Sequence, residues 1–258
     1  MRQSRFPLIV TILTLIFLYL PIIVLFVNSF NGSRFGGIWG EFSLKWYYRL
    51  WSDRAIWDAF WNSMIIAISS TAVSTVLGSL AAFALYRYKK SGLQKVNYGL
   101  IYTPLILPDI LMGISLLLFF VFLNIKLGLF TIFIAHTTFC ISYVTMVMLA
   151  RLQNFDFYMI EASQDLGASP WQTFTKVMLP ILAPGIAAGA LLAFTLSIDD
   201  FVITFFVAGP GATTLPIYVY GMIKFGSPPL INALSTILIL TTFVIVWLTH
   251  RLMGEETA

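Results

Sequence analysis

The chain consists mainly of long apolar runs separated by short polar segments. The runs recur at about 20 residues, the length with which an α-helix crosses a hydrocarbon core of roughly 30 Å. Helices are expected because the exposed edges of strands find no hydrogen-bond partners in lipid. The pattern therefore predicts an all-α integral membrane protein with six transmembrane helices, over residues 7–27, 62–86, 98–123, 127–150, 181–208 and 231–249.

Composition and charge agree with that class. Apolar residues make up 59% of the chain and charged residues 10%, whereas a soluble domain carries roughly 25% charged residues. The net charge of +4 is then loop charge that orients the helices, not a nucleic-acid footprint. With a cytoplasmic N-terminus, nine of the 15 basic residues fall in inner segments, and Lys89 and Lys90 follow the second span. Both termini and the segment 151–180 are therefore predicted to be cytoplasmic.

Arg2 and Arg5 precede the first apolar run, as in a secretory signal peptide. The run is longer than a typical signal core, and no small-x-small cleavage site follows it, so we expect a retained span. Cys140, the single cysteine, lies inside the fourth span and is expected to be a packed thiol.

The segment 31–60 is the sizeable outer loop before the second span, and it mixes aromatic with charged residues. Large amphipathic rings gather at membrane–water interfaces, so we expect a short helix lying at the outer surface. The alternative is an aromatic cage for a cationic ligand. The aromatic residues are Trp46, Tyr47, Tyr48, Trp51, Trp57 and Trp61.

The polar segment 151–180 carries helix start and stop signals. Asp156 can cap a first helix that ends near Gly167, because glycine suits the left-handed position after a helix. Ser169 and Gln172 then have the spacing of a capping box, with Pro170 in the first turn. Two short helices joined by a tight turn are predicted. Their apolar knob, which suits a groove on a soluble partner, comprises Leu166, Ala168, Trp171 and Phe174.

The same segment resembles a known motif. Glu161-Ala162-Ser163, then Gly167 after three further residues, then Leu179-Pro180 before an apolar run is similar to the EAA motif of type I ATP-binding-cassette (ABC) importer permeases, the MetI-like fold. Ser163 and Val177 replace the usual alanine and isoleucine with small changes in volume. More narrowly, permease subunits of spermidine/putrescine importers resemble the strings Ala84-Leu85-Tyr86-Arg87-Tyr88, Pro108-Asp109-Ile110, Phe194-Thr195-Leu196-Ser197-Ile198-Asp199-Asp200 and Gly221-Met222-Ile223-Lys224.

The resemblance implies a subunit of a bacterial inner-membrane importer. A second permease subunit would complete the pore, an ATPase dimer would dock on the 151–180 loop and bind ATP and Mg, and a periplasmic binding protein would deliver the substrate. In agreement, no glycine precedes a lysine as a phosphate-binding loop requires. We expect no catalytic residue, metal or cofactor site in this chain. The implied ATPase-coupling residues are Glu161, Ala162, Leu166, Gly167, Trp171, Leu179 and Pro180.

Three acids lie within the predicted spans, namely Asp109, Asp199 and Asp200, with no basic residue inside any span. A carboxylate at mid-bilayer costs on the order of 2.5–3.5 kcal/mol, so such a group usually faces a cavity or a partner. We expect these acids to receive a cationic cargo such as a polyamine. Alternatively, Asp109 satisfies backbone groups freed by a kink at Pro108, and one acid of the pair bonds a neighbouring helix. Possible polar companions on the pathway are Thr195, Ser197 and Tyr218.

Other features are expected to be structural. The pattern Gly185-x-x-x-Gly189 permits close helix approach within the permease pair, His136 reads as a hydrogen-bonded structural residue, and Gly209-Pro210-Gly211 reads as a turn. The expected organisation is a first helix with the outer aromatic segment (1–58), a permease core (59–250) and a cytoplasmic tail (251–258). Another small cationic cargo is the alternative within this role. A membrane scaffold or enzyme is the alternative from another class.

Overall fold

The computed structural model describes residues 6–33, 38–88, 92, 94–226 and 228–254, without the side chains of 228 and 245–254. Several residues used above to predict orientation and the tail lie outside the described residues: Arg2, Arg5, Arg34, Lys89, Lys90, Glu255, Glu256 and the side chains of His250 and Arg251.

Helices form the regular structure of the described residues, and one isolated bridge joins Asn31 and Phe42. The all-α class is thereby confirmed. The helices are α1 Phe6–Asn28, α2 Lys45–Ser52, α3 Arg54–Arg87, α4 Gln94–Ile106, α5 Asp109–Phe122, α6 Leu129–Gln153, α7 Tyr158–Asp165, α8 Pro170–Thr173, the π-helix Phe174–Met178, α9 Leu179–Asp199, α10 Val202–Val207, α11 Leu215–Phe225 and α12 Pro228–Gly254.

The number of spans supported is four or five. By length and composition α1, α3, α6 and the continuous run Pro170–Asp199 can each cross a membrane, and α4 with α5 makes a fifth if the pair is one bent span. The apolar part of α12 within the described residues, Pro229–Val244, is shorter than these candidates. The prediction of six spans is therefore not confirmed.

The third predicted span is not one kinked helix. Its two halves, α4 and α5, are bent by 113° at a break before Asp109. Pro108 lies in the break with an extended backbone (φ −58°, ψ 137°). Proline has no N–H to donate, and its ring disfavours a helical residue before it, so a new helix starts here more readily than the old one continues.

The fifth predicted span, 181–208, is likewise divided. α9 ends at Asp199, Asp200 is extended (ψ 119°), and α10 begins at Val202. The Asp200 carboxylate accepts the N–H groups of Ile203 at 3.4 Å and Thr204 at 2.8 Å. These are unpaired first-turn donors of α10, so Asp200 supplies the cap that makes α10 a separate helix. Both corrections place the predicted acids at helix breaks.

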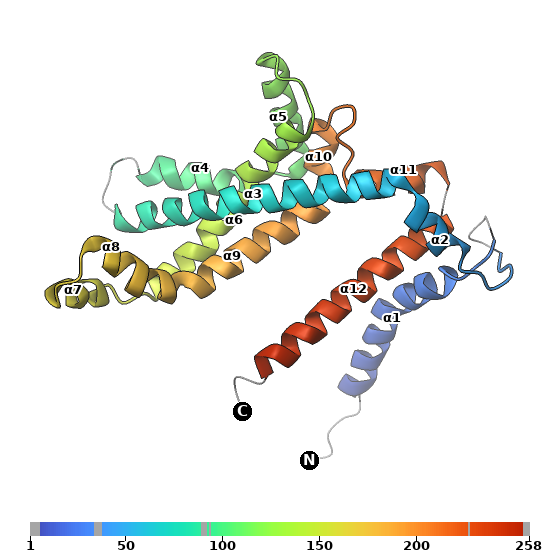
Figure 1. Ribbon diagram of the computed structural model, residues 1–258, viewed down its shortest axis with the longest axis horizontal. Helices are drawn as coiled ribbons and strands as arrows, with labels where there is room; N and C mark the ends of the chain where they lie inside the picture. The colour runs from blue at the N-terminus through green and yellow to red at the C-terminus, as the bar shows by residue number, and fades with distance from the viewer. Residues whose placement is uncertain (1–5, 34–37, 89–91, 93, 227, 255–258) are drawn as a thin grey trace. The chain divides into compact units, whose positions relative to one another are not determined.

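Contacts divide the chain into two units, Met1–Trp57 with Tyr218–Ala258, and Asp58–Ile217. In the first unit α12 packs against α1 and α2, and α1 and α12 lie side by side (Figure 1). A short amphipathic helix is present as predicted: α2 buries Trp46 and Leu50 and exposes Tyr48 and Trp51. The Trp46 indole donates to the Asn31 carbonyl at 2.8 Å. Its interfacial position stays a prediction.

In the second unit α6 is the central helix, with α4, α9 and α10 packed against it (Figure 1). Gly185 and Gly189 of α9 face α6: a Cβ at Gly185 would lie 2.8 Å from Arg151 Cγ, and one at Gly189 3.3 Å from Val144 Cγ1. We expected this glycine pattern to serve the permease pair. Instead it brings two helices of the same chain together, and Arg151 donates to the Ile181 carbonyl at 2.9 Å across the contact.

Candidate functional site

The turn of the 151–180 segment forms as its residues predict. The Asp156 carboxylate accepts the Tyr158 N–H at 3.0 Å at the start of α7. After α7, Gly167 has φ +85° and its N–H donates to the Gln164 carbonyl at 2.8 Å. This backbone region is sterically unfavourable for residues with a Cβ. The left-handed turn predicted at Gly167 is confirmed.

The second cap is also as predicted. Ser169 Oγ accepts the Gln172 N–H at 3.3 Å, while Gln172 Oε1 accepts the Ser169 N–H at 2.8 Å. The two sides of the turn are joined by the hydroxyls of Ser163 and Thr173, 2.9 Å apart. A capping box therefore begins α8 and a side-chain bond holds it against α7.

The second short helix was predicted wrongly, because α8 does not end before the membrane. It continues through the π-helix Phe174–Met178 into α9, and Pro170–Asp199 is one run of 30 residues. The wide turn stands directly before Leu179 and Pro180, which are exposed at the start of α9. A proline ring clashes with the carbonyl four residues earlier in a regular helix, and a π-turn accommodates the lost bond. The turn is thus joined to Asp199 by one continuous helical run.

The turn presents an exposed apolar surface. Leu166 is 89% exposed, Trp171 71% and Phe174 43%, and the rings of the last two lie 5.9 Å apart. Glu161 and Ala162 are exposed on the adjacent helix α7. Large apolar side chains gathered this way outside a core typically mark a contact surface for another protein.

A second constellation lies where the two interrupted spans meet. A pocket of about 250 Å³ is lined by all three predicted acids. Asp109 comes from the first turn of α5, Asp199 from the last turn of α9, and Asp200 from the break before α10. The other lining residues are Pro104, Phe139, Tyr143, Leu196, Phe201, Val202 and Ile203, so no basic side chain lines this pocket.

The three carboxylates differ in their partners. Asp200 accepts the Thr204 hydroxyl at 2.7 Å in addition to its capping bonds, and lies 3.3 Å from His136 Nε2. Asp109 and Asp199 are exposed, and among the described residues neither forms a hydrogen bond or ion pair with another side chain. Asp200 is therefore committed to the protein, whereas the other two can bind a ligand.

The predicted companions Ser197 and Thr195 have local partners. Ser197 Oγ lies 2.7 Å from His136 Nδ1 and 3.0 Å from Ser70 Oγ, and it is buried. The Thr195 hydroxyl donates to the Leu191 carbonyl at 2.8 Å. Neither residue lines the pocket of the acids. The reading of His136 as a hydrogen-bonded buried residue is confirmed.

Tyr218 belongs to the first unit, where its hydroxyl donates to Asp53 Oδ2 at 3.2 Å. Burial, followed by the nearby Asp53 carboxylate, raises the pKa of Tyr218 above its ordinary value. The phenol is thus held in its neutral form as a donor.

Three aromatic residues of the pocket, Phe139, Tyr143 and Phe201, were missed from the sequence. Phe139 and Tyr143 stand one turn apart on α6 and both line the pocket beside the acids. The signal was their four-residue spacing, which places two rings on one helix face. Such rings attract a cation through the negative charge of their faces.

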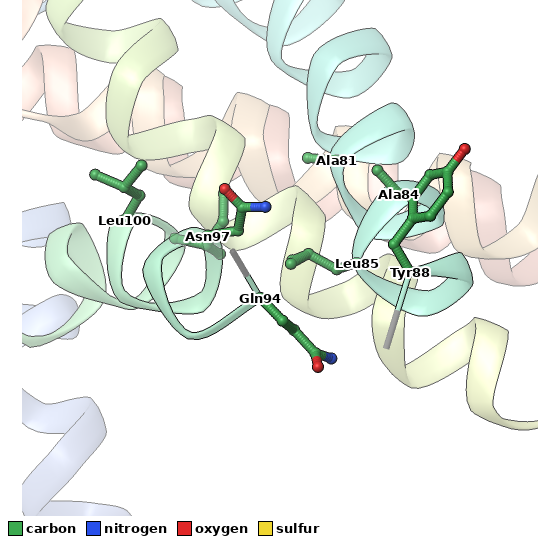
Figure 2. A pocket seen from close by; sticks show the side chains of 8 residues that line it. Ala81, Ala84, Leu85, Tyr88, Gln94, Asn97 and Leu100 are labelled. Atoms are coloured by element: carbon green, nitrogen blue, oxygen red, sulfur yellow. The ribbon is translucent and has the colours of Figure 1, made fainter. Parts of the chain in front are cut away.

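A different pocket, of about 380 Å³, lies between α3 and α4 (Figure 2). Figure 2 shows Ala81, Ala84 and Leu85 of α3, Tyr88 directly after α3, and Gln94, Asn97 and Leu100 of α4. Its lining contains amides and a phenol but no carboxylate. It therefore lacks the negative charges that the pocket of the acids offers to a cation.

Comparisons with known proteins agree with this architecture. Residues 74–253 match the family model described as binding-protein-dependent transport system inner membrane component. Spermidine/putrescine transport system permease protein PotC of Escherichia coli (strain K12) is 43% identical over 241 residues, covering 93% of this chain and 91% of the relative. Putrescine transport system permease protein PotI of the same strain is 38% identical over 259 residues, covering 98% and 92%.

Solved structures share the fold. A chain of a bacterial ABC transporter involved in the import of the acidic polysaccharide alginate superposes with a TM-score of 0.74 at 18% identity, covering 97% of this chain and 98% of that chain. A chain of the MetNI methionine ABC transporter gives a TM-score of 0.60 at 18% identity, covering 77% and 93%.

The family match covers most of the chain, and the apolar helices fit a multi-pass protein of the inner membrane. The chain belongs to the family of binding-protein-dependent transport system inner membrane components, the permease subunits of ABC importers.

Proposed function

We propose that this chain is one of two permease subunits of an ATP-driven importer of polyamines, spermidine and putrescine. The observation that carries the cargo assignment is the pocket at the helix breaks, where three carboxylates and three aromatic rings meet and no basic side chain of the described residues lines the wall. The two relatives named above have polyamines in their names and support the same cargo.

The pocket suits a chain of amines for electrostatic reasons. Asp109 and Asp199 have no partner side chain of opposite charge among the described residues. A carboxylate within a membrane protein's spans is costly without a partner charge, so a passing ammonium group is attracted to it. Because the two acids belong to different helices, they can hold successive amines, while Phe139 and Tyr143 offer ring faces to the same charges.

The coupling machinery belongs to partners. We infer that a PotB-like second permease subunit completes the pathway, a PotD-like periplasmic protein delivers the polyamine, and a PotA-like ATPase dimer binds ATP and Mg. The ATPase would dock on the cytoplasmic turn through Leu166 and Trp171, with Glu161 beside them. Both termini would then be cytoplasmic, as the charge distribution predicts.

The test is uptake by the complete importer in proteoliposomes, with radiolabelled spermidine and putrescine. Asp109→Asn and Asp199→Asn each remove one charge at nearly constant shape. A charge-assisted hydrogen bond contributes about 1.5–3 kcal/mol, so each change should slow uptake by about tenfold or more. Asp58→Asn is the matched control, because Asp58 is exposed and outside the pocket.

Polyamine uptake at the normal rate by the Asp109→Asn, Asp199→Asn double variant would exclude this pocket as the cargo site. Uptake of a different small cation, with no polyamine uptake by the unaltered importer, would keep the pathway but reassign the cargo.

A further inference from the structure

A single buried side chain bonds both halves of the interrupted fifth span. His136 of α6 is 1% exposed. Its Nδ1 lies 2.7 Å from Ser197 Oγ in α9, and its Nε2 lies 2.8 Å from Thr204 Oγ1 in α10. The same Nε2 is 3.3 Å from Asp200 Oδ2 at the break between them. The imidazole therefore bridges α9 and α10 across the break, and it does not itself line the pocket.

The hydrogen bonds around Thr204 show which atom donates between His136 Nε2 and Thr204. The one hydroxyl hydrogen of Thr204 is donated to Asp200 Oδ2 at 2.7 Å, so the Thr204 oxygen can only accept from the ring. Nε2 consequently carries a hydrogen, which it directs at Thr204 and the nearby Asp200 carboxylate. The ring thus supports Asp200 both directly and through Thr204.

Fixing Asp200 also fixes its neighbour. With donors from His136, Thr204 and Ile203 around it, the Asp200 carboxylate is held at the start of α10. Asp199 is the last residue of α9 and lines the pocket. Asp199 and Asp200 share one peptide bond. The backbone conformation that fixes the Asp200 side chain therefore also determines the direction of the Asp199 side chain. His136 also packs on Phe139, a pocket residue, with ring centroids 5.3 Å apart.

We propose that His136 is a positioning residue of the transport pathway: it bridges α9 and α10 so that the Asp199 carboxylate faces the cargo pocket. The inference rests on the proposed function, in which Asp199 contacts the polyamine. It assigns His136 no contact with cargo. Its effect on transport passes through Asp199.

Two substitutions separate the parts of the bridge. His136→Leu removes both ring nitrogens and so the bonds to Ser197 and Thr204. In His136→Gln the amide nitrogen reaches about as far as Nε2 and keeps a donor for Thr204 and Asp200. Thr138→Val is the control on the same helix, because Thr138 is exposed and its hydroxyl only bonds the Ile134 carbonyl four residues back.

The experiment measures spermidine uptake and ATP hydrolysis together in proteoliposomes containing the complete importer. His136→Leu should lower the maximum uptake rate by about tenfold and lower the spermidine imported per ATP hydrolysed. The reason is that the variant lacks the ring N–H that faces the Asp200 carboxylate. His136→Gln should fall between this variant and the unaltered protein. The concentration for half-maximal uptake should change by less than about twofold, because capture by the external protein is unaffected.

The decisive measurement is a double-mutant cycle with Asp199→Asn. If His136 acts through Asp199, His136→Leu should add less than about a twofold loss in the Asp199→Asn background, because residues acting through one contact are not additive. Losses that multiply, or unchanged uptake in both His136 variants, would overturn the positioning role. Where His136→Leu fails to assemble, the same cycle is run with His136→Gln.

The outcome separates this inference from the proposed function. Loss of uptake in Asp199→Asn together with a multiplicative His136 effect rejects only the positioning role. Unchanged uptake in Asp199→Asn rejects the contact between Asp199 and the cargo, and the positioning role falls with it, whereas the pocket itself is tested by the Asp109→Asn, Asp199→Asn double variant.

Discussion

Substitution of Gly167 tests whether the turn between α7 and α8 couples the chain to a partner ATPase. Gly167 has φ +85°, and a Cβ added there would meet nothing within 4 Å. A side chain at this position therefore encounters no steric clash beyond its own backbone. The penalty is torsional, which makes the site suitable for a graded series of substitutions.

The magnitude follows from that torsion. Placing an ordinary L residue in the left-handed region costs roughly 1–2 kcal/mol, and a β-branched residue is the more strained case. Asparagine tolerates the region, so Gly167→Asn is the control for adding a side chain of similar size without the torsional penalty. A penalty of roughly 1–2 kcal/mol lowers the population of the docking conformation about 5- to 30-fold. The expected order of function is Gly, Asn, Ala and then Val.

The assay is binding of the partner ATPase to detergent-solubilised permease, followed by uptake per ATP hydrolysed in proteoliposomes. Gly167→Val should raise the dissociation constant about 5- to 30-fold and lower the coupling ratio, whereas Gly167→Asn should change either by less than about threefold. Equal behaviour of the Val and Asn variants would refute the reasoning, since only the Val variant carries the full torsional penalty at positive φ.

Two further predictions concern stability. Gly185→Ala should lower the free energy of unfolding by about 1–3 kcal/mol, because its Cβ would lie 2.8 Å from Arg151 Cγ. Gly189→Ala should lower it by less, because its Cβ would lie 3.3 Å from its nearest neighbour. Thermal unfolding in detergent measures both changes, and equal effects would contradict the close-packed contact. Tyr218→Phe removes the hydrogen bond to Asp53, which stabilises the protein by about 1 kcal/mol at most. Because the pKa of Tyr218 is raised in the folded protein, this stabilisation is present below the ordinary tyrosine pKa and is lost as pH rises through the folded value. The melting temperatures of the variant and the unaltered protein should therefore converge between pH 7 and 11, and a constant difference would contradict the argument.

Local signals in the sequence were reliable where the interaction spans a few residues. The capping box of Ser169 and Gln172 and the left-handed turn at Gly167 formed as predicted, because all of their hydrogen bonds lie within one turn of chain. The predicted end of the second helix was wrong. Helix continuity past Pro180 depends on whether a wider turn absorbs the proline, and residue preferences do not determine that.

Long-range features were only partly predictable. The three acids in predicted spans, Asp109, Asp199 and Asp200, were recognised as unusual, and a kink beside Asp109 was one alternative. The complete helix breaks were missed, because hydropathy is the same for a straight span and a divided one. Likewise, nothing in the sequence distinguished Asp199 from Asp200. The difference comes from His136, which lies 64 residues earlier than Asp200 and reaches it only after α6 packs on α9 and α10.

The sequence by itself determined the membrane class, the turn at Gly167 and the presence of uncompensated acids, because apolar run length, helix caps and charge count are properties of neighbouring residues. Only the tertiary structure decided which carboxylates are available and which rings accompany them. The pocket draws its lining from α4, α5, α6, α9 and α10, and a site assembled from five helices depends on packing geometry that no single stretch of chain encodes.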